Sequence, residues 1–470
     1  MLKKTKIVAT IGPVTENKIT IEKMIKAGMN VGRLNFSHGN YEEHFKRIKL
    51  IREAAKKFEK PVAILQDLGG PKIRIGDFYK ESIILKTGQQ FILTTDKCVG
   101  DEERVFINYK NLPKEIKKGA KIILNDGKNE LLVEKISNND IHCRILVGGE
   151  IKGRRGVNLP GSKIKISSLT FKDKEDIKFG IKHKVDFIAV SFVRTPDDIL
   201  ELKNILKRVK ADIKVIAKIE TQEAIENIDS IIAVADGIMV ARGDLAVEVP
   251  AEHVPILQKM IIKKCNDIGK PVITATQMLS SMVNNYSPTR AEVNDVANAI
   301  LDGTDAIMLS EETTIGNYPV KVVETMTRIS RHIEEHFDYE EILRHKHLLP
   351  KSISDSISFS VVSVAHNIDA KVIVALTETG HTARMIARYK PKQPILTLTA
   401  NEKTFRQMAL SFGCRSRLIE NFNRISIMIE EAKKLSVKYK MAKAGDKIVI
   451  AAGVPFGKSG TTNLLIVQVI

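Results

Sequence analysis

Lys218 and Glu220 stand two residues apart in the short apolar run KVIAKIE, which we interpret as a β-strand. Alternate residues of a strand point to the same side, so this ammonium and this carboxylate can share one site. Taken alone, they would form an ordinary ion pair. Asp244 follows the next apolar run, and two carboxylates with few other protein ligands suit Mg²⁺. With Arg33 beside them, Lys218, Glu220 and Asp244 are suited to transferring a phosphoryl group.

Polar residues also follow the other short apolar runs of the chain. They are Arg33, Asn35, Ser37 and His38 in the second run, Asp67 in the third, Ser191 in the fourth, Arg242 and Gly243 with Asp244 in the sixth, Thr276 in the seventh, and Ser310 and Glu312 in the eighth. Some have a structural alternative. His38 is equally consistent with a hydrogen-bonded loop histidine, and Ser191 and Ser310 with caps of strand ends.

The apolar runs themselves predict the fold. Eight of them occur, most followed by an amphipathic helical stretch: KIVATIG, VGRLNFSHG, PVAILQDLGGP, DFIAVSFVR, KVIAKIE, DGIMVARGD, PVITATQ and DAIMLSEE. This alternation favours an α/β fold with a closed (β/α)8 TIM barrel, whose active site lies at the carboxyl ends of the strands. An open doubly wound sheet is the alternative. Two helix starts are predicted, with Thr195 or Ser287 as N-cap before Pro196 or Pro288.

A long interval separates the third run from the fourth. Between Lys72 and Leu159 the sequence has short strands with turn signals at NDG 125–127, SNND 137–140 and GG 148–149, which predict a small inserted all-β domain. After residue 345 the runs KVIVAL, PILTLT and DKIVIAA predict a third, α/β domain. We therefore expect the barrel at 1–71 and 160–345, the insert at 72–159 and the C-terminal domain at 346–470.

Composition narrows the class of protein. The chain of 470 residues has no apolar run near the roughly 18 to 20 residues that cross a bilayer. Cys98, Cys143, Cys265 and Cys414 show no metal or disulfide spacing, which favours the cytoplasm. The net charge of +18 raises nucleic-acid binding as an alternative, but the basic residues are dispersed and favour a solvated surface.

At this point the sequence resembles the pyruvate kinase family over nearly its full length. The segments RLNFSHG, VIAKIETQEAI, GIMVARGDL, ITATQML, PTRAEVNDVANAILDG and GVNLPG are similar to that family's blocks, in its order. The resemblance implies a barrel, a mobile β-barrel lid and a C-terminal regulatory domain in a homotetramer. It also implies the last step of glycolysis, in which phosphoenolpyruvate phosphorylates ADP to give pyruvate and ATP.

The resemblance implies a role for each site residue. Arg33 would bind the phosphate of phosphoenolpyruvate, and Gly243, Asp244 and Thr276 would bind its carboxylate. Glu220 and Asp244 would bind the Mg²⁺, which Mn²⁺ could replace. Lys218 would stabilise the charge of the transferring group, and Thr276 with Ser310 would protonate the enolate. Asn35, His38, Arg74 and Arg155 would contact the nucleotide. Glu311 and Ala246 replace glycines of the family, and Glu311 puts a bulky charge beside Ser310.

Lys72 in QDLGGPKIRIG stands where the family commonly has glutamate. Asn35, Ser37, Asp67 and the Leu68 carbonyl match the family's site for a monovalent cation. A lysine there supplies its own positive charge, so K⁺ is not expected to be required. A surface lysine at a hinge is the alternative reading of Lys72.

The C-terminal loops LTETGHT and GKSGTTN match loops that bind a phosphorylated effector in allosteric members of the family. Thr377, Thr379, Thr382, Lys458 and Ser459 are the candidates, with ordinary turns as the alternative. Two other functions remain open: a different magnesium-dependent barrel enzyme that forms enolates from pyruvate-like acids, and a basic nucleic-acid-binding protein.

Overall fold

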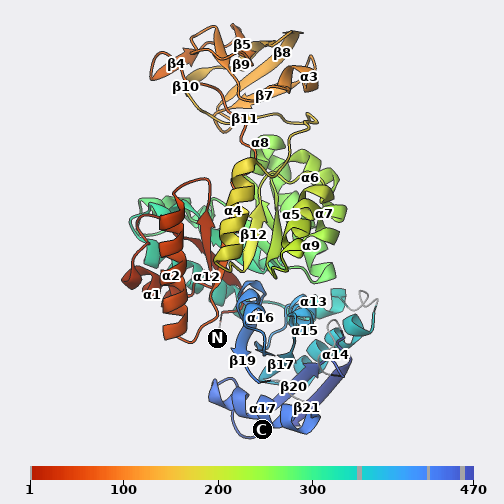
Figure 1. Ribbon diagram of the computed structural model, residues 1–470. Helices are drawn as coiled ribbons and strands as arrows, with labels where there is room; N and C mark the ends of the chain where they lie inside the picture. Colours follow the sequence, from red (N-terminus) through yellow and green to blue (C-terminus); the bar gives the residue numbers. More distant parts are fainter. Residues whose placement is uncertain (1–2, 347–351, 421–423, 456–460) are drawn as a thin grey trace.

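The parallel strands close into a barrel at the centre of the molecule (Figure 1). The computed structural model describes residues 3–346, 352–420, 424–455 and 461–470. The barrel strands are β1 (Lys6–Thr10), β2 (Val31–Asn35), β3 (Ala63–Asp67), β12 (Phe187–Val190), β13 (Lys214–Ile219), β14 (Gly237–Ala241), β15 (Val272–Ala275) and β16 (Ala306–Leu309). Their order is β1-β16-β15-β14-β13-β12-β3-β2, so the prediction of a closed barrel is confirmed and the open sheet is not formed.

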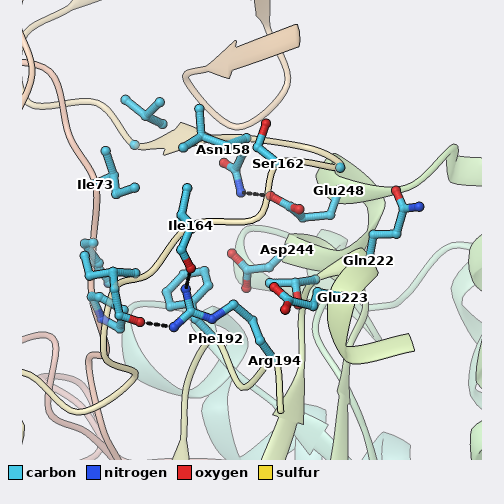
Figure 2. A pocket seen from close by; sticks show the side chains of 18 of the residues that line it. Ile73, Asn158, Ser162, Ile164, Phe192, Arg194, Gln222, Glu223, Asp244 and Glu248 are labelled. Carbon is cyan, nitrogen blue, oxygen red and sulfur yellow. Dashed lines mark hydrogen bonds between the residues drawn. The ribbon is translucent and has the colours of Figure 1, made fainter. Parts of the chain in front are cut away.

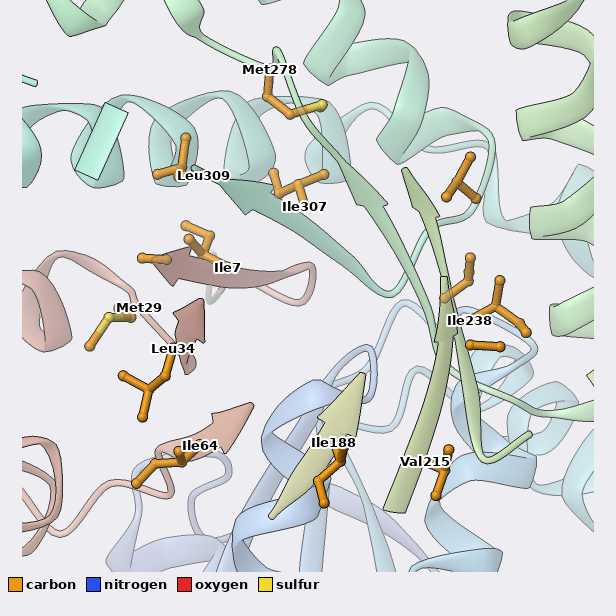
Figure 3. Close-up of a cluster of buried hydrophobic side chains, with 14 of the residues drawn as sticks. Ile7, Met29, Leu34, Ile64, Ile188, Val215, Ile238, Met278, Ile307 and Leu309 are labelled. Carbon is orange, nitrogen blue, oxygen red and sulfur yellow. The ribbon is translucent and has the colours of Figure 1, made fainter. Parts of the chain in front are cut away.

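Both sides of the barrel wall are buried, which explains the continuous apolar runs. One set of alternate residues faces the surrounding helices and includes Ile7, Ile64 and Ile188 (Figure 3). The other set, with Val31, Leu65 and Ile216, packs in a separate core inside the barrel. Strand periodicity then determines the site, because Arg33, Asp67 and Lys218 each follow one of these interior residues by two positions. Their side chains therefore cap the interior core at the carboxyl ends of the strands.

Helices surround the barrel. They are α1 (Lys18–Ala27), α2 (Tyr41–Lys57), α4 (Phe171–Lys182), α5 (Pro196–Arg208), α6 (Gln222–Glu226), α7 (Ile228–Val234), α8 (Arg242–Glu248), α9 (Val254–Ile268), α10 (Arg290–Leu301), α11 (Glu311–Thr314) and α12 (Pro319–Glu335). Thr195 is the N-cap of α5, as predicted. The prediction of Ser287 was wrong: α10 begins at Arg290 because Thr289 forms a reciprocal capping box with Glu292.

The insert after β3 carries strands β4 (Ser82–Leu85), β5 (Gln90–Thr94), β6 (Arg104–Phe106), β7 (Lys121–Leu124), β8 (Asn129–Ser137), β9 (Asp140–Val147), β10 (Gly149–Lys152) and β11 (Val157–Asn158), and one short helix, α3 (Leu112–Glu115). They form a sheet β10-β4 and a sheet β11-β7-β8-β9-β5-β6 around a core of their own. The predicted turns are present, with left-handed backbone at Asn125, Asp126 and Asn138.

The C-terminal domain packs under the other end of the barrel (Figure 1). Its elements are α13 (Tyr339–Lys346), α14 (Ile353–Asn367), β17 (Val372–Leu376), α15 (His381–Ala387), β18 (Ile395–Thr399), α16 (Glu402–Gln407), β19 (Cys414–Leu418), α17 (Ile425–Lys438), β20 (Lys447–Ala452) and β21 (Leu464–Val469). The sheet order is β19-β18-β17-β20-β21, with β21 antiparallel. Within the described residues, no helix is both long and apolar enough to span a membrane.

Candidate active site

Four barrel strands bring their terminal polar groups to one point. Lys218 Nζ lies 2.8 Å from Glu220 Oε1 and 3.4 Å from Asp67 Oδ1. It also lies 2.6 Å from Ser191 Oγ, just after β12. Arg33 Nε donates to the other oxygen of Asp67 over 2.6 Å. Residues from the second to the fifth apolar run of the sequence are thus in direct contact.

Burial makes these charges interact strongly. Asp67 and Glu220 are each 1% exposed. Burial disfavours the Lys218 ammonium, but Asp67 and Glu220 outweigh it and raise the pKa of Lys218. Burial would also raise the pKa of Asp67, yet Lys218 and Arg33 hold it below its usual range. The site therefore keeps a permanent ammonium at its floor.

At Glu220, burial has a larger effect on the pKa than the neighbouring charges have. Burial raises its pKa to about 7, Lys218 partly opposes this shift, and the Asp244 carboxylate adds to it. Oxygen Oε2 of Glu220 accepts a hydrogen bond of 2.6 Å from the backbone N–H of Phe192. Asp244 is exposed in the first turn of α8, directly after β14. A divalent cation between these two carboxylates would offset their mutual repulsion.

The donor set suits Mg²⁺ rather than a metal held entirely by the protein. Among the residues that the structure describes, no group of three or more His, Cys, Asp and Glu side chains is arranged to hold a metal ion. Two carboxylates at an open rim leave room for the waters and substrate oxygens that Mg²⁺ retains. Glu220 and Asp244 thus fit the predicted metal site.

A cavity of about 300 Å³ lies between the barrel rim and the insert (Figure 2). Its barrel wall includes the acids Glu223, Asp244 and Glu248, and its other wall includes Lys72, Arg74 and Arg155. Arg74 and Arg155 lie on adjacent segments, since Ile75 N–H donates to the Arg155 carbonyl over 3.1 Å. Both predicted nucleotide contacts of the insert therefore face one cavity.

The remaining predicted nucleotide contacts are Asn35, the last residue of β2, and His38, in the loop that follows. Asn35 Oδ1 accepts the Ser37 N–H over 3.1 Å. Partial burial, with Lys72, Arg74 and Arg33 nearby, lowers the pKa of His38. His38 is thus close to the basic wall, whose positive charges disfavour protonation of its ring.

Lys72 reaches the predicted monovalent-cation site. Its ammonium donates to Ser37 Oγ over 3.0 Å. Burial of the ammonium and the nearby Arg74 and Lys218 lower the pKa of Lys72, while Asp244 and Glu220 act in the opposite direction. The Leu68 carbonyl accepts from Ser191 Oγ over 2.8 Å, and Asp67 Oδ1 has the Lys218 ammonium as its ion-pair partner at 3.4 Å.

The last two barrel strands contribute Thr276 and Ser310. Thr276 has a left-handed backbone with φ of 69°, and its Oγ1 accepts the Gly243 N–H over 2.8 Å. Ser310 N–H donates to the Glu312 carboxylate over 2.7 Å. In the described ranges, Ser310 and Thr276 make no direct hydrogen bond with each other. Arg242 pairs with Asp295 at 2.6 Å and so has a structural contact outside the site.

The predicted effector loop follows β17 and contains Thr377 and Thr379. Thr382 Oγ1 lies 2.8 Å from Thr462 Oγ1, so the two loops noted in the sequence do meet. Lys458 and Ser459 lie outside the described residues.

Sequence reasoning missed most of the cavity lining, including Phe192, Arg194 and Glu248. The Arg194 guanidinium binds the carbonyls of Ile164 and Ile166, and Asn158 Nδ2 donates to Glu248 Oε1 over 3.2 Å (Figure 2). The only available signal for Arg194 was a basic residue at the end of the apolar run DFIAVSFVR.

Comparison with known proteins agrees with this geometry. Residues 2–323 match the family model for the pyruvate kinase barrel domain, and residues 355–468 match the model for the pyruvate kinase alpha/beta domain. A pyruvate kinase of Bacillus licheniformis is 48% identical over 474 residues, covering 100% of this chain and 81% of that protein. One of Clostridium perfringens is 45% identical, covering 99% of this chain and 100% of that protein.

A solved structure gives the same result. The crystal structure of a pyruvate kinase from Cryptosporidium parvum superposes with a TM-score of 0.95 at 38% identity, covering 99% of this chain and 96% of that one. The models together match well over half of the residues, and the relatives align along the whole chain. The chain belongs to the pyruvate kinase family.

Proposed function

We propose that the site transfers the phosphoryl group of phosphoenolpyruvate to ADP, giving pyruvate and ATP. The observation that carries this proposal is the buried Lys218 ammonium, held by Glu220 and Asp67 beside a cavity with a basic far wall. The cation lies where charge develops during transfer, and the basic wall can receive a nucleotide diphosphate. The phosphate to be transferred would lie between them.

Each step has a group on this chain. Arg33 binds the phosphate of phosphoenolpyruvate, while the Gly243–Asp244 turn and Thr276 bind its carboxylate. The bond from phosphorus to the enol oxygen breaks as a terminal oxygen of ADP bonds to phosphorus. Lys218 stabilises the negative charge on the phosphoryl oxygens and on the enolate that remains. The methylene carbon then takes a proton, for which Thr276 and Ser310 are the candidate donors.

When bound at Glu220 and Asp244, Mg²⁺ supplies Lewis-acid stabilisation of phosphoryl charge, a role that Mn²⁺ can also fill. The nucleotide contacts are Arg74 and Arg155 of the insert, with Asn35 and His38. We propose that residues 72–159 act as the lid over this site. Residues 1–71 and 160–345 together form the barrel domain, and residues 346–470 form the regulatory domain.

A coupled assay for ADP-dependent pyruvate formation tests the function. Turnover that requires phosphoenolpyruvate, ADP and Mg²⁺ together supports it. Chemistry on pyruvate-like acids without ADP would instead indicate another enolate-forming enzyme. Tight binding of RNA or DNA without turnover would indicate a nucleic-acid-binding protein.

We infer that K⁺ is not required. Lys72 donates to Ser37 Oγ, and Ser37 with Asn35, Asp67 and Leu68 matches the cation site, so its ammonium takes the place of a cation there. Burial, Arg74 and Lys218 lower the pKa of Lys72, and the nearby Asp244 and Glu220 partly oppose this shift, so the assignment rests on the contact with Ser37. A fixed ammonium beside the phosphate makes a bound cation redundant.

Regulation and assembly are also proposed. Thr377, Thr379, Thr382, Lys458 and Ser459 would bind a phosphorylated effector, and the Thr382–Thr462 contact supports a joint site. A homotetramer would cover apolar side chains such as Ile256 and Leu301, which are 68% and 57% exposed. Sedimentation velocity tests the assembly.

The four cysteines are free thiols, in keeping with a cytoplasmic protein.

A further inference from the structure

The chain returns from the insert to the barrel through residues 160–167, between β11 and α4. This return linker is held from two sides. Arg194 donates to the carbonyl of Ile164 over 3.1 Å and to the carbonyl of Ile166 (Figure 2). The N–H of the residue between them, Lys165, donates to Glu115 Oε2 of the insert over 2.9 Å. In extended chain, alternate residues point in opposite directions, so one short segment can bond to the barrel and to the insert at once.

Arg194 is an unusual choice for a simple packing contact. It is 9% exposed, and no carboxylate of the described residues pairs with its guanidinium. Buried charges are normally paired with an opposite charge. Here the cation is satisfied by main-chain carbonyls of the return linker, so its burial depends on where that linker lies.

The backbone of Arg194 is itself fixed on the barrel. Its N–H donates to Asp198 Oδ2 over 2.8 Å, and its carbonyl accepts from Asn227 Nδ2 over 3.0 Å. Thr195, the next residue, is the N-cap of α5. The guanidinium is therefore presented from a base bonded to the barrel, and the segment that it holds is the return linker.

The same short segment also supports the reacting groups. Ser191 Oγ lies 2.6 Å from Lys218 Nζ, and the Phe192 N–H donates to Glu220 over 2.6 Å. Phe192 has a left-handed backbone with φ of 54°, which is uncommon for a bulky residue and requires support from its surroundings. Residues 191–194 thus connect Lys218 and Glu220 at one end to the return linker at the other.

We propose that Arg194 is a positioning residue for phosphoryl transfer. By holding the return linker, it sets the distance between the nucleotide contacts of the insert, Arg74 and Arg155, and the Lys218 ammonium of the barrel. This inference rests on the proposed function of the site. Misplacing one reactant by about 1 Å can cost about a hundredfold in rate, so the position of the insert matters directly.

The test compares Arg194→Gln and Arg194→Lys with wild type in steady-state assays. Two lost hydrogen bonds predict a rise of about tenfold in KM for ADP in Arg194→Gln, with a lower kcat. KM for phosphoenolpyruvate should change by less than about threefold, because its contacts are all on the barrel. Arg194→Lys keeps the charge but not the two-pronged geometry and should recover part of the loss.

Arg52→Gln is the control for a general loss of stability. Arg52 bonds two main-chain carbonyls, of Val62 at 3.1 Å and Lys184 at 3.3 Å, and also pairs with Asp186 at 2.7 Å, at the opposite end of the barrel. Arg52→Gln should lower the stability of the protein, but it should not raise KM for ADP more than KM for phosphoenolpyruvate. Equal shifts of both KM values in Arg194→Gln, or none, would overturn the proposal. If Arg194→Gln does not fold, Arg194→Lys decides by the same criterion.

Amide hydrogen exchange gives a readout that needs no turnover. In wild type the Lys165 amide should be protected, and in both Arg194 variants it should exchange at least about tenfold faster. If the Lys165 amide exchanged at the wild-type rate in both variants, Arg194 would not hold the return linker, even if activity fell. Should wild type make no pyruvate, the proposed function fails, while the exchange result still decides whether Arg194 holds the return linker.

Discussion

Lys218 Nζ lies 2.8 Å from Glu220 Oε1, with both side chains on the interior face of the barrel at the end of β13. The pair is buried, yet each of its two members also interacts with other side chains. Asp67 and Ser191 also contact the ammonium, and Asp244 acts on the carboxylate. The lysine is thus a fixed charge that has Asp67 and Ser191 as partners in addition to Glu220.

Replacing Lys218 by Met should abolish most turnover while the protein still binds phosphoenolpyruvate. Loss of one transition-state stabiliser typically costs about a hundred- to a thousandfold in kcat. Steady-state kinetics and direct binding of phosphoenolpyruvate measure the two effects separately. A fall in kcat of less than tenfold would show that Lys218 does not have this role.

Lys72→Glu should make activity dependent on K⁺. Wild type is expected to be fully active with Mg²⁺ in buffer free of K⁺ and Na⁺, because its ammonium already supplies the charge beside Ser37. The variant replaces that charge by a carboxylate, which an added cation can balance. Activity is measured with and without K⁺ at constant ionic strength. A tenfold or larger response of wild type to K⁺ would contradict the assignment.

A sugar phosphate or nucleotide monophosphate should shift the half-saturating concentration of phosphoenolpyruvate. An effector acts by binding two states of the protein with different affinities. The combined change Thr382→Ala and Ser459→Ala should remove the response and leave basal kinetics in place. A panel of phosphates that never moves the saturation curve, or moves it equally in the variant, would eliminate this site.

Stability should fall on acidification partly because of His44. Its ring stacks on Phe36 with centroids 4.0 Å apart, and Nε2–H donates to the His38 carbonyl over 3.0 Å. Burial, with Arg47 nearby, lowers the pKa of His44 to about 4, whereas an unfolded histidine titrates near 6.5. Between these values the unfolded state binds more protons, so stability present above pH 6.5 is lost as the pH falls toward 4.

For one proton this slope is at most about 1.4 kcal/mol per pH unit. His44→Gln can still donate to the His38 carbonyl but does not titrate, so urea unfolding between pH 4 and 7 should show a smaller slope. The same slope in both proteins would assign the acid sensitivity to other groups.

Lys390→Met should destabilise the contact between the C-terminal domain and the barrel. Lys390 Nζ lies 3.0 Å from Asp305 Oδ1, and the two side chains are 2% and 6% exposed. Removing one partner of a buried pair typically costs about 3 to 5 kcal/mol, because the other charge stays buried. Lys371→Met is the control, since its pair with Asp369 is exposed and its loss should change stability much less. Denaturant unfolding of both variants decides; equal losses would contradict the prediction.

The sequence by itself determined which segments form the barrel and which side chains lie at its rim. Every barrel strand lies in one of the eight apolar runs, and the two-residue period places Lys218 and Glu220 on the same side of their strand. The turn residues at 125–127 and the capping pair at Thr195 were likewise readable, because these signals act over a few residues.

Only the tertiary structure decided which side chains of these segments contact one another. Ser287 looked like a helix N-cap, but Thr289 displaced it because its partner Glu292 completes the box. The local signal at Arg194, a basic residue at the end of an apolar run, did not reveal its partners, since these are carbonyls of Ile164 and Ile166, which every residue type possesses. A hydrogen bond to main chain leaves no trace in the side-chain pattern of its acceptor, so such a contact becomes visible only when the chain has folded and the two segments lie together.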